Sequence, residues 1–202
     1  MKPERSVNLG PGDALVIVDV QNDFLPGGAL PAPRGHEILE PLNQAIAAFR
    51  ARGLPIFATR DWHPPDHISV LGRGGPWPAH GVAGTPGARF PDGLKLPERG
   101  GIVSKATDRD QEAYSGFEGT TLEERLRCLG VRRVFVGGLT TEYCVLNTVK
   151  DALASGFDVV LLSDAIRAVD VKPGDGASAE AEMERRGAVP TRVTNLGKKS
   201  AA

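Results

Sequence analysis

The chain has 202 residues and a formal net charge of −1, which favours a single domain and excludes charge-driven binding to nucleic acid or to an anionic membrane surface. No apolar run approaches the roughly 20 residues that span a bilayer, and the polar residues 1–11 do not resemble a signal peptide. Two cysteines cannot form a disulfide framework and suit a reducing compartment. We therefore expect one cytoplasmic domain over residues 1–202 with short disordered ends, residues 197–202 among them, and no nucleic-acid or membrane partner.

Short apolar runs mark the expected strands. The first, residues 14–19, is continuous and ends in a carboxylate, which is typical of a strand buried on both faces of a parallel sheet. The others cover residues 54–59, 101–104, 134–137, 158–162 and, more weakly, 189–193. Helical periodicity separates most of them, over residues 38–49, 120–129, 141–155 and 177–186. This alternation predicts a three-layer α/β/α sandwich around a mostly parallel central sheet of roughly six strands.

Two segments carry further local signals. Thr120 and Glu123 stand at the spacing of a capping box, so we expect the second helix to begin there. Residues 61–99 are rich in proline and glycine and lack periodicity. A segment of that length inside a compact domain is usually a functional loop.

Residues able to do chemistry follow the expected strands. Asp19 ends the first strand, and Asp61 and His63 follow the second. Lys105 follows the third, and a turn after the fourth delivers Cys144 to the start of a helix. Because ligands bind at the carboxyl ends of strands in open α/β sheets, we expect these side chains to share one site.

Cys144 is the candidate nucleophile. A helix N-terminus and a nearby Lys105 would both favour its thiolate. Asp19 could take the thiol proton and later activate water, and the N–H groups of Thr140 and Cys144 could stabilise an oxyanion. A buried core cysteine is the alternative for Cys144, and it is the interpretation we give to Cys128. A structural ion pair is the alternative for Asp19 and Lys105.

The histidines suggest a metal site. Asp61 and His63 lie on one face of an extended segment, and His67 and His80 follow in the same loop. A carboxylate with two imidazoles suits zinc, iron or manganese. Solvent-exposed loop histidines are the alternative, and spacing alone does not decide between them. His36, at a helix start, is expected at the surface.

Four aromatic side chains lie in loops that follow strand ends, where flat rings can stack on a heteroaromatic ligand. They are Phe24, Trp62, Trp77 and Tyr114. For Trp62, packing into a small satellite core is an equal alternative.

Together these motifs resemble the nicotinamidase/pyrazinamidase branch of the isochorismatase-like cysteine hydrolases, over residues 14–193. They are Asp19-Val-Gln-Asn-Asp-Phe24 with Gly27-Gly28, Asp61-Trp-His63, Asp66-His67, Trp77-Pro-Ala-His80, Gly84-Thr-Pro-Gly-Ala88, Lys105 with Tyr114-Ser-Gly-Phe117, and Gly138-Leu-Thr-Thr-Glu-Tyr-Cys-Val145. Ala106 and the pair Glu142-Tyr143 depart from the pattern of many members.

The resemblance implies a role for each matching position. Asp19, Lys105 and Cys144 match the catalytic triad, and Phe24, Trp77 and Tyr114 match the wall around a pyridine ring. Asp61, His63 and His80 match the ligands of one divalent metal ion, zinc first, with iron or manganese as alternatives. His67 matches a further ligand present in some members. The Leu139–Thr140 bond matches a non-proline cis peptide.

The activity implied by the resemblance is that of a nicotinamidase, an amidohydrolase acting on a linear amide. It converts nicotinamide to nicotinate and ammonia through a cysteine thioester in NAD salvage, with pyrazinamide as a second substrate. A metal-free relative that hydrolyses isochorismate or a carbamoyl amide is the alternative within the fold. A catalytically silent binding module is the alternative outside it, against which the joint presence of Asp19, Lys105 and Cys144 argues. The sequence does not decide whether the protein forms a homo-oligomer.

Overall fold

The computed structural model describes residues 6–98 and 101–197, which form one six-stranded parallel sheet between two layers of helices. The strands are β1 (Asp13–Val18), β2 (Ile56–Asp61), β3 (Gly101–Lys105), β4 (Arg133–Leu139), β5 (Asp158–Arg167) and β6 (Val189–Thr191). Their order in the sheet is β3-β2-β1-β4-β5-β6. The predicted parallel α/β sheet is confirmed. β5 continues to Arg167 beyond the predicted end because Ser163 and Asp164 interrupt its apolar run without ending the strand.

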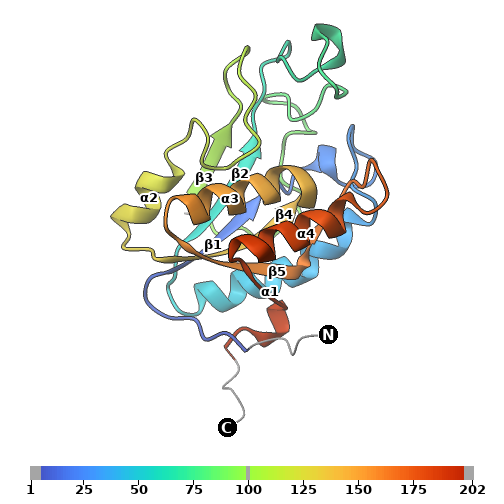
Figure 1. Cartoon of the computed structure of the whole chain (residues 1–202). Coiled ribbons are helices and arrows are strands. Elements are labelled where there is room, and N and C mark those ends of the chain that lie inside the picture. The colour runs from blue at the N-terminus through green and yellow to red at the C-terminus, as the bar shows by residue number, and fades with distance from the viewer. Residues whose placement is uncertain (1–5, 99–100, 198–202) are drawn as a thin grey trace.

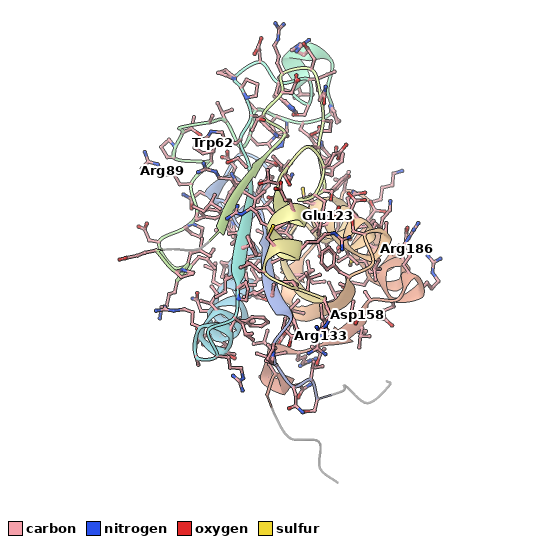
Figure 2. All side chains as sticks on the ribbon, turned by 90° about the vertical axis from the view of Figure 1, so that its left-hand side faces the viewer. Trp62, Arg89, Glu123, Arg133, Asp158 and Arg186 are labelled. Carbon is pink, nitrogen blue, oxygen red and sulfur yellow. The ribbon has the colours of Figure 1, made fainter. Side chains whose placement is uncertain are left out.

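Four α-helices cover the sheet: α1 (Leu39–Arg50), α2 (Leu122–Cys128), α3 (Leu146–Ala154) and α4 (Asp175–Arg186). Short 3₁₀ turns span Asn22–Phe24, Gly35–Ile38, Leu71–Arg73 and Val193–Asn195, and a π-helical turn, Thr141–Val145, leads into α3. Helix α1 lies on one face of the sheet, and α2, α3 and α4 lie on the other (Figure 1), an arrangement seen edge-on in Figure 2. The three-layer prediction is confirmed.

Strand β1 shows why the layers form. All six of its residues are buried, and successive side chains of a strand point to opposite faces. Leu15 and Ile17 pack in the core beneath α1. Val16 and Val18 pack in the core beneath α2, α3 and α4. A continuous apolar run is therefore required, because both faces of this strand are covered.

The strand order places a crevice beside β1. From β1 the chain builds outward through β2 and β3, and it then returns to place β4 on the other side of β1. Such a switch point is where parallel sheets bind ligands. Gly138 permits the close approach of β4 to β1, since its φ is 135° and an added Cβ would lie 2.1 Å from the carbonyl oxygen of Val18.

The long loop between β2 and β3 extends beyond the carboxyl ends of these strands (Figure 1). In Figure 2, Trp62 at the start of this loop lies at the opposite end of the sheet from Arg133 and Asp158, which begin β4 and β5. Within residues 62–98 only a three-residue 3₁₀ turn is regular. The prediction of a long loop is confirmed.

Two local predictions are wrong. Helix α2 begins at Leu122 without a capping box, because Glu123 accepts hydrogen bonds from Ser155 and Arg127 instead of reaching back to Thr120. Cys128 is exposed, not buried, because it ends this short helix and does not join its buried face. His36 is exposed, as expected.

The chain ends lie partly outside the described residues. Of the predicted disordered residues 197–202, only Gly197 is described, and its N–H donates to the carbonyl oxygen of Val7 at 2.9 Å. Among the described residues, no helix is long and apolar enough to cross a membrane.

Candidate active site

The three predicted catalytic side chains meet at the carboxyl ends of β1, β3 and β4. Lys105 Nζ lies 3.1 Å from Asp19 Oδ2 and 3.6 Å from Cys144 Sγ. The exposed fractions are 0% for Asp19, 1% for Lys105 and 6% for Cys144. A carboxylate, an ammonium and a thiol are therefore in contact in a site nearly closed to water.

Asp19 is held by the neighbouring strand. It leaves β1 with a φ of 47°, and its N–H donates to the carbonyl oxygen of Thr59 at 3.2 Å. The Thr59 hydroxyl donates to Asp19 Oδ1 at 2.7 Å. The other carboxylate oxygen, Oδ2, is buried and forms an ion pair with the Lys105 ammonium at 3.1 Å. One oxygen is thus fixed by Thr59, while the other faces Lys105 and is the candidate acceptor of a proton.

The protonation states suit a base and a neutral thiol. Burial raises the pKa of Asp19 to about 6, a rise that Lys105 limits and Asp61 increases. Burial also raises the pKa of the Cys144 thiol well above its usual value, and this outweighs the opposing effect of Lys105. Lys105 thus favours the thiolate as expected, but burial keeps the thiol protonated in the resting site. Cys144 lies inside the π-helical turn, and two carboxylates share the single ammonium.

Asp61, His63 and His80 form a candidate metal centre, with one donor atom from each lying within 4.8 Å of the others. His63 Nδ1 lies 2.9 Å from the carbonyl oxygen of His80, and His80 Nδ1 lies 2.7 Å from that of Pro78. Because a carbonyl oxygen only accepts, each Nδ1 carries the proton and each Nε2 keeps its lone pair.

The donor set fits a divalent cation. His63 Nε2 is buried, has no hydrogen-bond partner among the described residues and lies 3.7 Å from Asp61 Oδ1. Burial alone would raise the pKa of Asp61. Lys105, whose Nζ lies 2.5 Å from Asp61 Oδ1, and His63 together outweigh burial. The pKa of Asp61 is therefore lowered, and its carboxylate stays ionised. Two imidazole nitrogens and a carboxylate leave coordination positions open for water or a substrate.

His67 has a different setting from the three candidate ligands. Its Nδ1 lies 2.7 Å from the Ser69 hydroxyl, and its Nε2 lies 2.9 Å from the carbonyl oxygen of Gln111. Its ring stacks on that of His63 with the centroids 4.1 Å apart. With these hydrogen bonds, His67 braces the His63 ring. One of its nitrogens also lies within 4.8 Å of donor atoms of His63 and Glu112, so its role as a further ligand stays a prediction.

A small aromatic pocket borders Cys144 and the candidate metal centre. It is lined by Phe24, Leu30, Asp61, Trp77, His80, Tyr114, Thr140, Tyr143, Cys144 and Val169. All three aromatic residues predicted for the wall line it. Trp62 does not line it, and its ring lies against the Arg60 guanidinium at 3.5 Å. A wider surface hollow lies beside Gly27 and His36, but none of the predicted catalytic residues borders it.

Sequence reasoning missed part of the pocket wall. The Tyr143 ring meets Trp77 edge-to-face at 5.1 Å, and its position next to Cys144 was a usable signal. Val169 comes from the segment after β5, where Glu142 accepts hydrogen bonds from the N–H groups of Val169 and Asp170. Only the folded chain brings that segment to the site.

The turn that carries the nucleophile has the expected backbone. The Leu139–Thr140 peptide bond is cis. The carbonyl oxygen of Thr140 accepts hydrogen bonds from the N–H groups of Tyr143 and Val145, which closes the π-helical turn around Cys144. π-Helical turns of this kind are frequent at functional sites.

Comparisons with known proteins place most of the chain in one family. The isochorismatase domain family matches residues 13–194. The nicotinamidase of Escherichia coli is 34% identical over 199 residues, covering 88% of this chain and 93% of that protein. The nicotinamidase/pyrazinamidase of Mycobacterium tuberculosis is 38% identical over 159 residues, covering 75% and 84%.

Solved structures give the same result. The pyrazinamidase of Pyrococcus horikoshii in complex with zinc superposes with a TM-score of 0.87 at 52% identity, covering 90% of this chain and 99% of that one. PnC1 of L. infantum in complex with nicotinate has a TM-score of 0.87 at 36% identity, with coverages of 94% and 98%. The chain therefore belongs to the isochorismatase family, in its nicotinamidase/pyrazinamidase branch.

Proposed function

We propose that this protein is a metal-assisted cysteine amidohydrolase that converts nicotinamide to nicotinate and ammonia, and that also accepts pyrazinamide. One observation carries the proposal. A buried Asp–Lys–Cys cluster shares the carboxylate of Asp61 with a two-histidine metal centre, and both border one small aromatic pocket. Relatives bound to nicotinate and to zinc support this reading.

The pocket would bind a flat heteroaromatic amide. The rings of Phe24, Trp77 and Tyr114 offer apolar faces to the substrate ring, which favours stacked or edge-on contacts. Trp77 donates to the Tyr114 hydroxyl at 3.1 Å, which fixes this wall. A divalent ion held by Asp61, His63 and His80 would supply a Lewis acid for the pyridine nitrogen. The aromatic wall would hold the ring with its carboxamide facing Cys144.

Acylation would begin with proton transfer from the Cys144 thiol to Asp19. The sulfur then attacks the carboxamide carbon and forms a C–S bond, and the electron pair moves to the oxygen. The N–H groups of Thr140 and Cys144 would stabilise this oxyanion. Asp19 returns the proton to the amide nitrogen, the C–N bond breaks, ammonia leaves and a thioester remains.

Deacylation would reuse the same base. Asp19 takes a proton from water, whose oxygen attacks the thioester carbon. The C–S bond then breaks, nicotinate forms and the proton returns to the sulfur. The Lys105 ammonium contacts both Asp19 and Cys144. Its charge favours the ionised carboxylate and offsets the negative charge that develops on sulfur.

Metal identity and location are also proposals. Zinc suits a site of two imidazoles and one carboxylate, and iron or manganese would fit the same donors. Cys128 and Cys144 are both free thiols, which supports a reducing, cytoplasmic location.

A substrate panel tests the proposed reaction. Purified protein is incubated with nicotinamide, pyrazinamide and a carbamoyl amide, and the acid products are separated by chromatography, with Cys144→Ala as the matched control. We expect nicotinate and pyrazinoate from the parent protein and neither from the variant. Turnover of the carbamoyl amide alone would contradict the proposal.

A further inference from the structure

Gln21 lies two residues after the base Asp19, and its side chain is fully buried. Its oxygen accepts the Asp61 N–H at 2.8 Å, and its nitrogen donates to the carbonyl oxygens of Asp61 and Ala88, each at 2.9 Å. The β1–β2 pairing has ended before this point, at Ile17. The Gln21 amide therefore hydrogen-bonds both the N–H and the carbonyl oxygen of Asp61, as a neighbouring strand would.

Asp23, two residues further on, holds the other side of the metal centre. Its Oδ2 accepts the N–H of Gly81 at 2.9 Å, directly after His80. The carbonyl oxygen of Gly81 in turn accepts the His63 N–H at 2.9 Å. Gly81 has a φ of 59°, and an added Cβ would lie 2.6 Å from that of Asp61. Asp23 thus holds Gly81, the residue where the segment carrying Asp61 and His63 meets the segment carrying His80.

These contacts matter because His63 and His80 lie outside any strand or helix, in the loop of residues 62–98. In the described part of the chain, their segments are joined by one isolated backbone bridge, between His63 and Val82, and not by a continuous strand ladder. The short segment Gln21–Asp23 hydrogen-bonds Asp61 in one ligand-bearing segment and Gly81, next to His80, in the other. This segment directly follows the base Asp19 and Val20 in the chain.

We infer that Gln21 and Asp23 are positioning residues that set the geometry of the metal centre, Gln21 through Asp61 and Asp23 through Gly81. The inference rests on the proposed function, because it takes Asp61, His63 and His80 as the ligands. Loss of such outer contacts typically weakens metal affinity by about 10–100-fold. A purely structural role would lower stability and leave the affinity of the folded protein unchanged.

Zinc binding to chelator-treated protein tests the inference without any activity measurement. Zn²⁺ affinity is measured by competition with a chromophoric chelator, at a temperature where circular dichroism shows each apoprotein to be folded. Gln21→Met removes the amide at similar volume, and Asp23→Ala removes the acceptor. Asp23→Asn keeps an acceptor for Gly81. Asn22→Ala is the matched control, because among the described residues the Asn22 side chain donates only to the carbonyl oxygen of Pro86.

We expect Gln21→Met and Asp23→Ala to bind Zn²⁺ about 10–100-fold more weakly than the parent protein, and Asn22→Ala to bind as tightly as the parent. Asp23→Asn should restore most of the affinity lost in Asp23→Ala. The absorption spectrum of bound Co²⁺ should change in the two weakened variants. If Gln21→Met fails to fold, the comparison of Asp23→Ala with Asp23→Asn tests the inference.

Two negative results are distinguishable. Parent-like affinity and Co²⁺ spectra in both variants would overturn the inference alone. A parent protein that binds no Zn²⁺, or binds it equally well after His63→Ala, would overturn the assigned metal centre and the inference with it.

Discussion

Replacing Thr59 by valine should change the pH dependence of catalysis. Thr59 is fully buried, and its hydroxyl donates to Asp19 Oδ1 at 2.7 Å. This hydrogen bond lowers the pKa of Asp19, against the larger rise from burial. Valine has nearly the same shape and removes the hydroxyl. That hydroxyl also accepts the Asp19 N–H at 3.2 Å, but this N–H keeps the carbonyl oxygen of Thr59 as an acceptor. The ionised form of Asp19 is therefore destabilised relative to the protonated form.

The size of the effect follows from the bond that is lost. A hydrogen bond to a charged group contributes about 1.5–3 kcal/mol, which corresponds to about one to two pH units. The pKa of Asp19 is about 6 in the parent protein. Because the base must be ionised to accept the thiol proton, the acid limb of kcat/KM should move from about pH 6 to about pH 7–8.

The assay is the rate of ammonia release from nicotinamide between pH 5 and pH 9, at substrate concentrations well below KM. Thr59→Ser keeps the hydroxyl and serves as the matched control, so its acid limb should stay with that of the parent protein. Circular dichroism confirms that each variant is folded. An acid limb in Thr59→Val that coincides with the parent limb would refute the assignment of Asp19 as the base.

Three further substitutions test other parts of the account. Cys144→Ala should lower turnover by about a thousandfold or more with an unchanged circular dichroism spectrum, and near-parent turnover would exclude Cys144 as nucleophile. His63→Ala should reduce bound metal below one ion per chain by elemental analysis and raise KM, whereas unchanged metal content would remove His63 from the ligands. Gly81→Ala should lower the free energy of unfolding by more than Gly84→Ala, because both residues have positive φ but only a Cβ at Gly81 would meet Asp61. Each left-handed alanine costs about 1–2 kcal/mol, so equal losses in denaturant unfolding would show that the Gly81 contact has no effect.

Much of the architecture was readable from the sequence because its signals are local. The continuous apolar run of β1 predicts a strand buried on both faces, and a carboxylate at its end predicts a polar group at the ligand-binding edge of the sheet. The same argument places Lys105 and Cys144 at that edge, and the structure brings Asp19, Lys105 and Cys144 into contact there.

What the sequence did not reveal depends on contacts between distant segments. The pKa of Cys144 is raised because burial and two carboxylates outweigh one lysine, a balance that no motif shows. His67 resembles a ligand by position, yet its nitrogens face Ser69 and Gln111, 2 and 44 residues away. Val169 comes to the pocket from the segment after β5, where its N–H donates to Glu142.

Metal removal and return during nicotinamide hydrolysis tests the central claim most directly. Ammonia release is measured on untreated protein, on chelator-treated protein, and after zinc, iron or manganese is returned to the treated protein. The account predicts that release falls on chelation and recovers with at least one of these ions, whereas Cys144→Ala stays inactive under every condition. Undiminished release from protein shown to be metal-free would contradict a metal-assisted site. No release under any condition would contradict the proposed reaction itself.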